Sequence, residues 1–236
     1  MARPVYTAER DNSVTYATVV FDLDGTLIDS APDLQTAANA ALAHAGRAPI
    51  DLATTIGFIG DGVEMLVRRA LRARHHPGDD VAGPLAAFHA AYDRCHAERT
   101  RPYPGALALL DRLAAAGVPM GLCTNKPEGP ARDICAALGL TGFGVVVGGD
   151  TLGVKKPDPA PLLHAIDALG GERRTTLYVG DSGVDRATAA AAGVPFALVA
   201  GGYLHGPLEG PPPEHRLDRI AEVADLTIPA HGRTTT

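Results

Sequence analysis

Val-Val-Phe-Asp-Leu-Asp-Gly-Thr-Leu, residues Val19–Leu27, joins a short apolar run to two closely spaced acids. The run before Asp22 is β-branched and aromatic, which is typical of a strand buried on both faces in a parallel sheet. Side chains alternate along a strand, so Asp22 and Asp24 are expected to point the same way where the strand ends. Two buried carboxylates are costly unless a cation or a reaction needs them. Gly25 then allows the backbone to turn sharply and approach a ligand.

A plainer interpretation of this stretch is a turn followed by a helix N-cap. The Asp-Gly pair alone would justify it, because both residues favour turns. The cost of burying two carboxylates after such a strand favours a functional site instead.

The composition excludes several classes of protein. The chain has 236 residues, a formal charge of −6 and no block of basic residues, which argues against a nucleic-acid binder. Its three cysteines form no C-x-x-C pair, so neither a disulfide framework nor a zinc site is expected. No apolar run reaches the ~20 residues of a membrane helix, and the polar arm at residues 1–15 has no apolar signal core. We therefore expect a cytoplasmic protein without membrane or nucleic-acid partners, as a monomer or homodimer.

Two patterns of apolar residues divide the rest of the chain. Between residues 30 and 101, apolar residues recur at helical spacing with no strand signal, which predicts a helical cap domain inserted after the first strand. Elsewhere, strands alternate with helices, which indicates βαβ units and a parallel sheet. We expect an α/β fold with a Rossmann-like core at residues 1–29 and 102–236, covered by helices, and the cap at residues 30–101. The later strands are expected at Met120–Cys123, Val145–Val147, Thr176–Val179 and Phe196–Val199, followed by a helix at 217–223 and an edge strand at 226–228.

The first cap helix has a recognisable beginning and end. Ser30 is expected to be its N-cap, with Asp33 in the position of a capping-box acid, and Gly46 marks its end. The tail at residues 229–236 is expected to be frayed.

Polar residues follow the predicted strands, where ligands of parallel sheets bind. The second strand is followed by Thr124, Asn125 and Lys126. The later elements supply a Lys155-Lys156-Pro-Asp-Pro stretch and a Gly-Asp181-Ser-Gly-Val-Asp185 stretch. Considered singly, Asp181 and Asp185 could be N-cap and first-turn acids, and Thr124 could serve the backbone.

Taken in order, these residues resemble the four motifs of the haloacid dehalogenase superfamily of phosphotransferases. The motifs are Asp22-Leu-Asp24-Gly-Thr, Thr124 after a hydrophobic strand, Lys156 before proline, and Gly-Asp181-x-x-x-Asp185. The resemblance covers nearly the whole chain, including the inserted cap. Within the superfamily the chain is most similar to bacterial phosphoglycolate phosphatases. The stretches that support this are 60–62, 102–105, 155–159 and 201–206.

The resemblance implies a division of roles among these residues. Asp22 is expected to be the nucleophile that forms an aspartyl-phosphate, and Asp24 the acid and base. Thr124, the amide groups that follow it at Asn125, and Lys156 are expected to hold the phosphoryl oxygens. The four acids would repel a phosphate unless a divalent cation were present. We therefore predict Mg²⁺ held by Asp22, the backbone carbonyl of Asp24 and Asp181, with Asp185 either a metal ligand through water or an anchor for the other ligands.

Substrate choice is assigned to the cap, and 2-phosphoglycolate, a small phosphorylated metabolite, is the substrate that the resemblance implies. Gly60, Asp61 and Gly62 precede a helix whose free amide groups could meet the substrate's anionic end. Asp61 itself is expected to cap that helix. We expect solvated surface charges at Lys126, Lys155, Arg68 and Arg69.

Other functions remain open at this level. The first alternative is another small-metabolite phosphatase or a sugar-phosphate mutase with the same core. A dehalogenase would need neither Asp24 nor a metal, and the acidic cluster argues against it. A non-enzymatic phosphoacceptor module has similar strand-end residues but is shorter and has no cap.

Overall fold

The computed structural model describes residues 15–75, 80–204, 206, 208, 210 and 212–228. The predicted polar arm before residue 15 and the predicted frayed tail after residue 228 lie outside the described residues. Among the helices of the described part, none is long and apolar enough to cross a membrane.

The core is a six-stranded sheet in the order β5-β4-β1-β6-β7-β8, in which every neighbouring pair is parallel. Neighbours that are distant in sequence, such as β1 and β6, require crossover connections, and these are the helices that cover the sheet. The strands are β1 (Thr18–Phe21), β4 (Met120–Cys123), β5 (Phe143–Val147), β6 (Thr176–Gly180), β7 (Phe196–Val199) and β8 (His215–Leu217).

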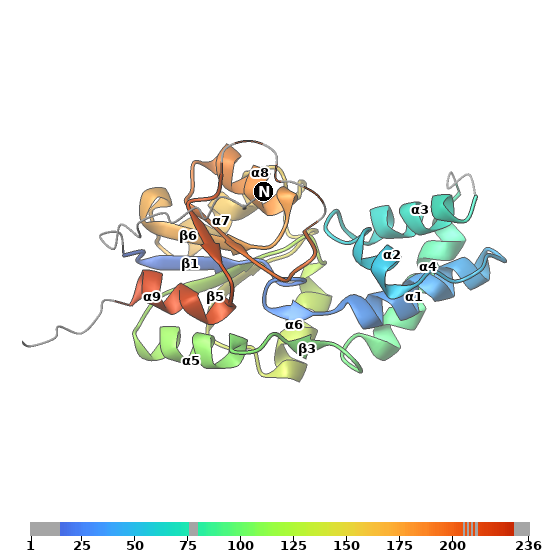
Figure 1. Ribbon diagram of the computed structural model, residues 1–236, viewed down its shortest axis with the longest axis horizontal. Helices are drawn as coiled ribbons and strands as arrows, with labels where there is room; N and C mark the ends of the chain where they lie inside the picture. Colours follow the sequence, from blue (N-terminus) through green and yellow to red (C-terminus); the bar gives the residue numbers. More distant parts are fainter. Residues whose placement is uncertain are drawn as a thin grey trace, which may run out of the picture.

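The sheet is buried on both faces, as the apolar run predicts. Val19 and Phe21 of β1 belong to one apolar cluster, and Val20 between them belongs to another. The first face is covered by α5 (Ala106–Ala115), α6 (Glu128–Leu138) and α9 (Val223–Thr227), and the second by α7 (Ala160–Ala168) and α8 (Gly183–Ala192) (Figure 1). The predicted α/β class with a parallel sheet is therefore confirmed.

Four helices lie together beside the sheet and are inserted between β1 and β4 (Figure 1). The long helices α1 and α4 pack against each other, and α2 and α3 pack on α1. Buried apolar residues such as Leu34, Leu66 and Phe88 fill the space between them. The helices are α1 (Ala31–His44), α2 (Leu52–Ile56), α3 (Val63–Ala73) and α4 (Ala82–Cys95).

The junction between the two parts contains strands that the sequence does not reveal. β2 (Ile28–Asp29) and β3 (Arg101–Pro102) form a two-stranded antiparallel ribbon where the chain leaves and re-enters the core. The stretch from Ser30 to about Arg101 was predicted to be all helical, whereas Arg101 begins β3. Neither strand was predicted, because two-residue strands carry no periodicity. The domain boundaries at residues 30 and 101 remain a prediction.

The beginning of α1 also differs from expectation. Ser30 is the N-cap residue, but its side chain makes no capping bond. Asp33 is not a capping-box acid: it accepts hydrogen bonds from the Thr100 amide at 2.8 Å and the Thr100 hydroxyl at 2.6 Å. The acid therefore ties α1 to the chain that returns to the core.

The end of the chain was assigned wrongly from its spacing. Residues 215–217 form β8 at the edge of the sheet, and a 3₁₀ turn at Ile220–Glu222 leads into α9. Leu226 belongs to this helix and not to an edge strand. Leu217 is buried because its strand pairs with β7, a contact between distant segments that local periodicity does not report.

Candidate active site

The site lies where the central strands end, on the side of the sheet that faces the helical insert. In the sheet β1 lies between β4 and β6, so residues that follow these three strands become neighbours. Asp22 follows β1, Thr124 follows β4 and Asp181 follows β6. A cleft with a cavity volume of about 50 Å³ opens here between the core and the insert. Its lining includes Asp22, Asp24, Thr124 and Lys156 from the core and Gly60 and Gly62 from the insert.

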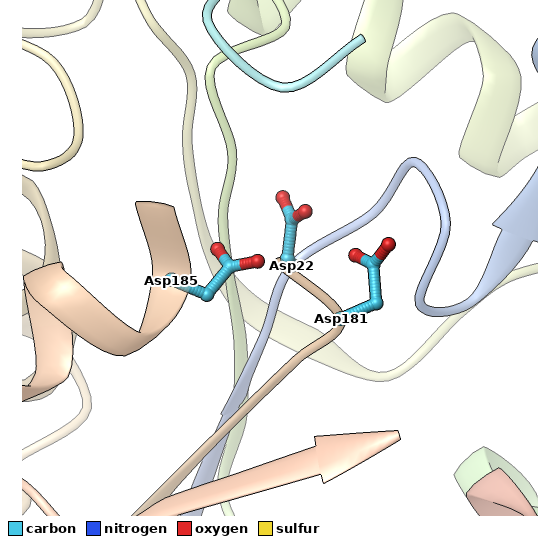
Figure 2. A group of neighbouring side chains, drawn as sticks. All are labelled: Asp22, Asp181 and Asp185. Atoms are coloured by element: carbon cyan, nitrogen blue, oxygen red, sulfur yellow. The ribbon is translucent and has the colours of Figure 1, made fainter. Parts of the chain in front are cut away.

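Three acids predicted as metal ligands come together. Ligand oxygens of Asp22, Asp181 and Asp185 all lie within 4.8 Å of one another, and all three residues are buried. Figure 2 shows that their carboxyl groups project into the same region, Asp22 from the loop after β1, Asp181 from the residue after β6 and Asp185 from the first turn of α8. Oxygen ligands of this kind suit a divalent cation such as Mg²⁺. The side chain of Asp24 is not part of this cluster.

The electrostatics of the cluster favour the binding of a cation. Burial, together with neighbouring carboxylates, raises the pKa of Asp22 to about 6, although Lys156 opposes the shift. Burial and the carboxylates of Asp185 and Asp22 raise the pKa of Asp181 well above its ordinary value. Acids whose ionised form is disfavoured in this way gain from a bound cation. The donor set therefore fits a divalent metal ion.

Asp181 is held in place by contacts from the loops around it. Its carboxylate accepts a hydrogen bond from the Thr26 hydroxyl at 2.9 Å and one from the Tyr203 amide at 2.5 Å. Gly25 has a φ of +89°, and a Cβ there would collide with Asp181 and Tyr203. The glycine after Asp24 is thus needed both for the turn and for the close approach of this loop to the acid.

Lys156 is the cation of the acidic cluster. Its ammonium lies 2.9 Å from Asp22 Oδ1 and 2.6 Å from Asp185 Oδ1, and it donates to the Tyr178 hydroxyl at 2.9 Å. Burial alone would lower the pKa of Lys156, but Asp185 and Asp22 raise it. The lysine therefore stays charged and faces the cleft, where it can meet an anion.

Asp185 has two tasks at once. It completes a capping box with Ser182 at the start of α8, which confirms the first-turn placement considered for it. Burial opposes its ionisation, but Lys156, Ser182 and Tyr178 lower the pKa of Asp185 below its ordinary value. Ser182, and not Asp181, is the N-cap residue of this helix.

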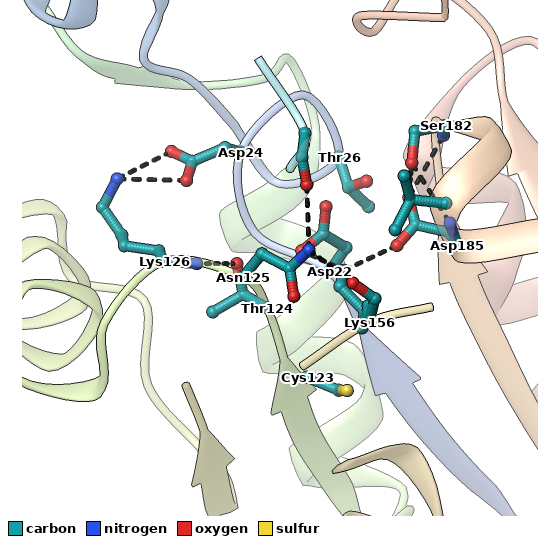
Figure 3. A network of polar contacts seen from close by, with 12 residues as sticks. Asp22, Asp24, Thr26, Cys123, Thr124, Asn125, Lys126, Lys156, Ser182 and Asp185 are labelled. Atoms are coloured by element: carbon teal, nitrogen blue, oxygen red, sulfur yellow. Dashed lines mark hydrogen bonds and ion pairs between the residues drawn. The ribbon is translucent and has the colours of Figure 1, made fainter. Parts of the chain in front are cut away.

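Asp24 has a separate set of partners. Both of its carboxylate oxygens contact the ammonium of Lys126, at 3.0 and 3.1 Å (Figure 3). Asp24 Oδ1 also accepts a hydrogen bond from the Ser30 hydroxyl at 2.5 Å. The prediction that Lys126 is a solvated surface charge was wrong, because only 7% of the residue is exposed. Its ammonium lies 5.0 Å from the ring centroid of Tyr92 on α4. Two lysines, and not one, therefore balance the acids of the site.

The residues after β4 arrange the wall of the cleft. Thr124 is buried and accepts a hydrogen bond from the Lys126 amide at 3.3 Å, while its own amide donates to β5. The Asn125 amide group donates to the carbonyls of Gly60 and Lys156, both at 3.0 Å, so it links the insert to the core. Within the described residues, Asn125 Oδ1 is buried and has no hydrogen-bond partner.

The predicted substrate loop is only partly as expected. Gly60 and Gly62 line the cleft, and Gly62 is the N-cap residue of α3. Asp61 does not cap the helix: its carboxylate forms an ion pair with Arg69. Arg69 is therefore not simply a solvated charge. Lys155 is exposed as predicted, and it donates to the Asp61 carbonyl at 2.7 Å.

The raised pKa of Asp22 predicts how the metal-free protein responds to pH. A carboxyl group with a folded-state pKa of about 6 holds its proton more tightly in the folded chain than in the unfolded chain. The free energy of unfolding should therefore fall, through this group, as pH rises from about 4 to about 6. Asp22→Asn removes the effect. In EDTA, the melting temperature of the variant minus that of the wild type should therefore increase as pH rises across this window. A difference that stays constant with pH would contradict the assignment.

The chain resembles known proteins over most of its length. Residues 16–193 match the haloacid dehalogenase-like hydrolase family. A phosphoglycolate phosphatase of Cereibacter sphaeroides is 48% identical over 211 residues, which covers 88% of this chain and 96% of that protein. One of Yersinia pestis is 41% identical over 91% of this chain and 92% of its own length. The crystal structure of a predicted phosphoglycolate phosphatase from Haemophilus somnus superposes with a TM-score of 0.83 at 29% identity, covering 88% of this chain and 96% of the other.

Proposed function

This chain belongs to the haloacid dehalogenase-like hydrolases, and from that premise we propose that it is a magnesium-dependent phosphatase that hydrolyses 2-phosphoglycolate to glycolate and phosphate. The observation that carries the proposal is the different environment of two neighbouring carboxylates at one cleft. Asp22 belongs to the three-acid cluster and contacts Lys156, whereas Asp24 contacts Lys126 and Ser30. Two carboxyl groups with different partners are suited to different chemical roles.

The first half-reaction transfers the phosphoryl group to Asp22. A carboxylate oxygen of Asp22 attacks phosphorus, and the bond from phosphorus to the ester oxygen breaks. Asp24 gives its proton to that ester oxygen, so glycolate leaves with a neutral hydroxyl group. Thr124 and the Lys156 ammonium stabilise the equatorial oxygens as negative charge spreads over them.

The second half-reaction returns the enzyme to its starting state. Asp24, now a carboxylate, takes a proton from water, and the water oxygen attacks phosphorus. The bond between phosphorus and the Asp22 oxygen breaks, so phosphate leaves and both acids regain their original forms. Ser30 and Lys126 hold the Asp24 carboxylate at the cleft during this step.

The residues that would hold Mg²⁺ are Asp22, Asp181 and the backbone carbonyl of Asp24, with Asp185 behind them. A bound divalent cation would neutralise the acids and the phosphoryl oxygens. Because Asp185 is already engaged by Lys156 and Ser182, it supports the site by positioning these groups.

Phosphate release with and without metal tests this proposal. We expect hydrolysis of 2-phosphoglycolate to need Mg²⁺, to stop in EDTA and to return when excess Mg²⁺ is added. The kcat/KM for 2-phosphoglycolate should be higher than the kcat/KM for small neutral phosphate esters. Equal rates with and without EDTA would contradict the metal assignment. No preference for 2-phosphoglycolate would contradict the substrate, and a requirement for a bisphosphate activator would favour a mutase. A stable phosphoprotein without turnover would favour a phosphoacceptor module.

A further inference from the structure

Lys126 is a buried cation to which the proposed chemistry gives no contact with the substrate. Its side chain is only 4% exposed, yet it lines the cleft. Long charged side chains are almost never fully buried unless they are paired. Its pairing with Asp24 explains why the ammonium tolerates burial, but a lysine at a cleft wall can also meet a ligand. Although burial opposes it, Asp24 raises the pKa of Lys126, so the charge persists.

The position of this ammonium matches one part of the proposed substrate. In the first half-reaction the ester oxygen must contact Asp24, because Asp24 protonates it. Lys126 lies 3.0 Å from the same carboxyl group. In 2-phosphoglycolate a single methylene separates the ester oxygen from the carboxylate. A substrate held at Asp24 therefore carries its second anion into the neighbourhood of Lys126.

Part of the wall of the cleft that Lys126 lines is apolar. Ile59, Val63 and Leu66 from the insert line the same cleft, together with Leu34 of α1. Apolar walls exclude water, and an ion pair gains strength where water is excluded. Tyr92 of the insert packs its ring against the ammonium and so positions it. Figure 3 shows Lys126 approaching Asp24 from one side of the site, whereas Asp185 lies on the other.

We propose that Lys126 is the specificity-determining residue of this site, and that its ammonium binds the carboxylate of the substrate's leaving group. The enzyme then selects short phosphate esters whose leaving group carries a carboxylate. This inference rests on the proposed function and adds Lys126 as the group that binds the substrate's carboxylate.

The test compares two esters that differ in that anion. Phosphate release is measured for 2-phosphoglycolate and for the neutral 2-hydroxyethyl phosphate, with wild type, Lys126→Met and Arg132→Met. Methionine keeps the unbranched stem and removes the charge, and Arg132 is an exposed cation on the following helix α6. For Lys126→Met we expect kcat/KM for 2-phosphoglycolate to fall roughly 10- to 100-fold relative to the neutral ester, mainly through KM. Arg132→Met should leave kcat/KM unchanged for both esters.

The alternative is that Lys126 only positions Asp24, and it gives a different result. In that case kcat would fall equally for both esters, which would overturn the inference. A wild type that prefers 2-phosphoglycolate and a Lys126→Met variant that keeps this preference would also overturn it, while leaving the proposed function intact. A wild type without that preference would overturn both.

A second measurement needs no variant. Glycolate should inhibit hydrolysis of 2-hydroxyethyl phosphate by the wild type competitively, and ethylene glycol, which lacks the carboxylate, should not. Equal inhibition by the two compounds would overturn the inference even if Lys126→Met fails to fold.

Discussion

Asp22→Asn should abolish phosphate release while leaving the fold intact. Asparagine has the same shape but cannot form the acyl phosphate, so kcat is expected to fall by roughly 10⁴-fold or more, the scale on which loss of a nucleophile acts in other enzymes. The structure adds a second expectation. Because burial disfavours the ionised form of Asp22, its replacement by a neutral amide should not lower the melting temperature of the metal-free protein at pH 7.

The measurement pairs initial rates of phosphate release with thermal unfolding in EDTA. Asp167→Asn is the matched control, because it makes the same chemical change at an exposed position on α7. It should alter neither quantity. Turnover above a hundredth of the wild-type rate in Asp22→Asn would show that another group attacks phosphorus. If Asp22→Asn is inactive, the melting curve shows whether the variant is folded. Absence of a thermal unfolding transition would contradict the second expectation.

Lys156→Met should cost the protein roughly 3–5 kcal/mol of unfolding free energy at pH 7, as well as its activity. Removing one partner of a buried ion pair leaves an uncompensated charge, which is the reason for the large penalty. Here two acids, Asp22 and Asp185, lose their common cation, and the Tyr178 hydroxyl loses its donor. Urea unfolding in EDTA measures the cost as a fall in the transition midpoint.

The neighbouring lysine supplies the control. Lys155→Met makes the same change one residue earlier, at an exposed side chain whose contact is a single backbone carbonyl. Its expected cost is below about 1 kcal/mol. Added Mg²⁺ should return part of the stability lost in Lys156→Met, since a cation in the acidic cluster compensates the same carboxylates. Equal midpoints for the two variants would mean that Lys156 does not serve as the internal counter-ion.

Much of the core could be predicted because each strand carries its own signal. Met120–Cys123 and Phe196–Val199 were predicted with the bounds that the structure has, since short apolar runs between turns mark buried strands. The meeting of Asp22, Asp181 and Lys156 was expected from their positions beyond strand ends together with the family resemblance, because the carboxyl ends of parallel strands share one edge of the sheet. The predictions for Asp61 and for the end of the chain were wrong, because a local pattern does not show which distant partner a side chain or strand contacts.

The parallel sheet, the helical insert and the acids at the strand ends can be inferred from the amino-acid sequence, because apolar periodicity and strand-end position are local properties. The burial of Lys126 against Asp24 and the hydrogen bonds between Asp33 and Thr100 can be seen only in the folded chain. Those partners lie 102 and 67 residues apart in the chain. The free energy of burying a charge depends on the partner it finds, and only the folded chain brings that partner into place.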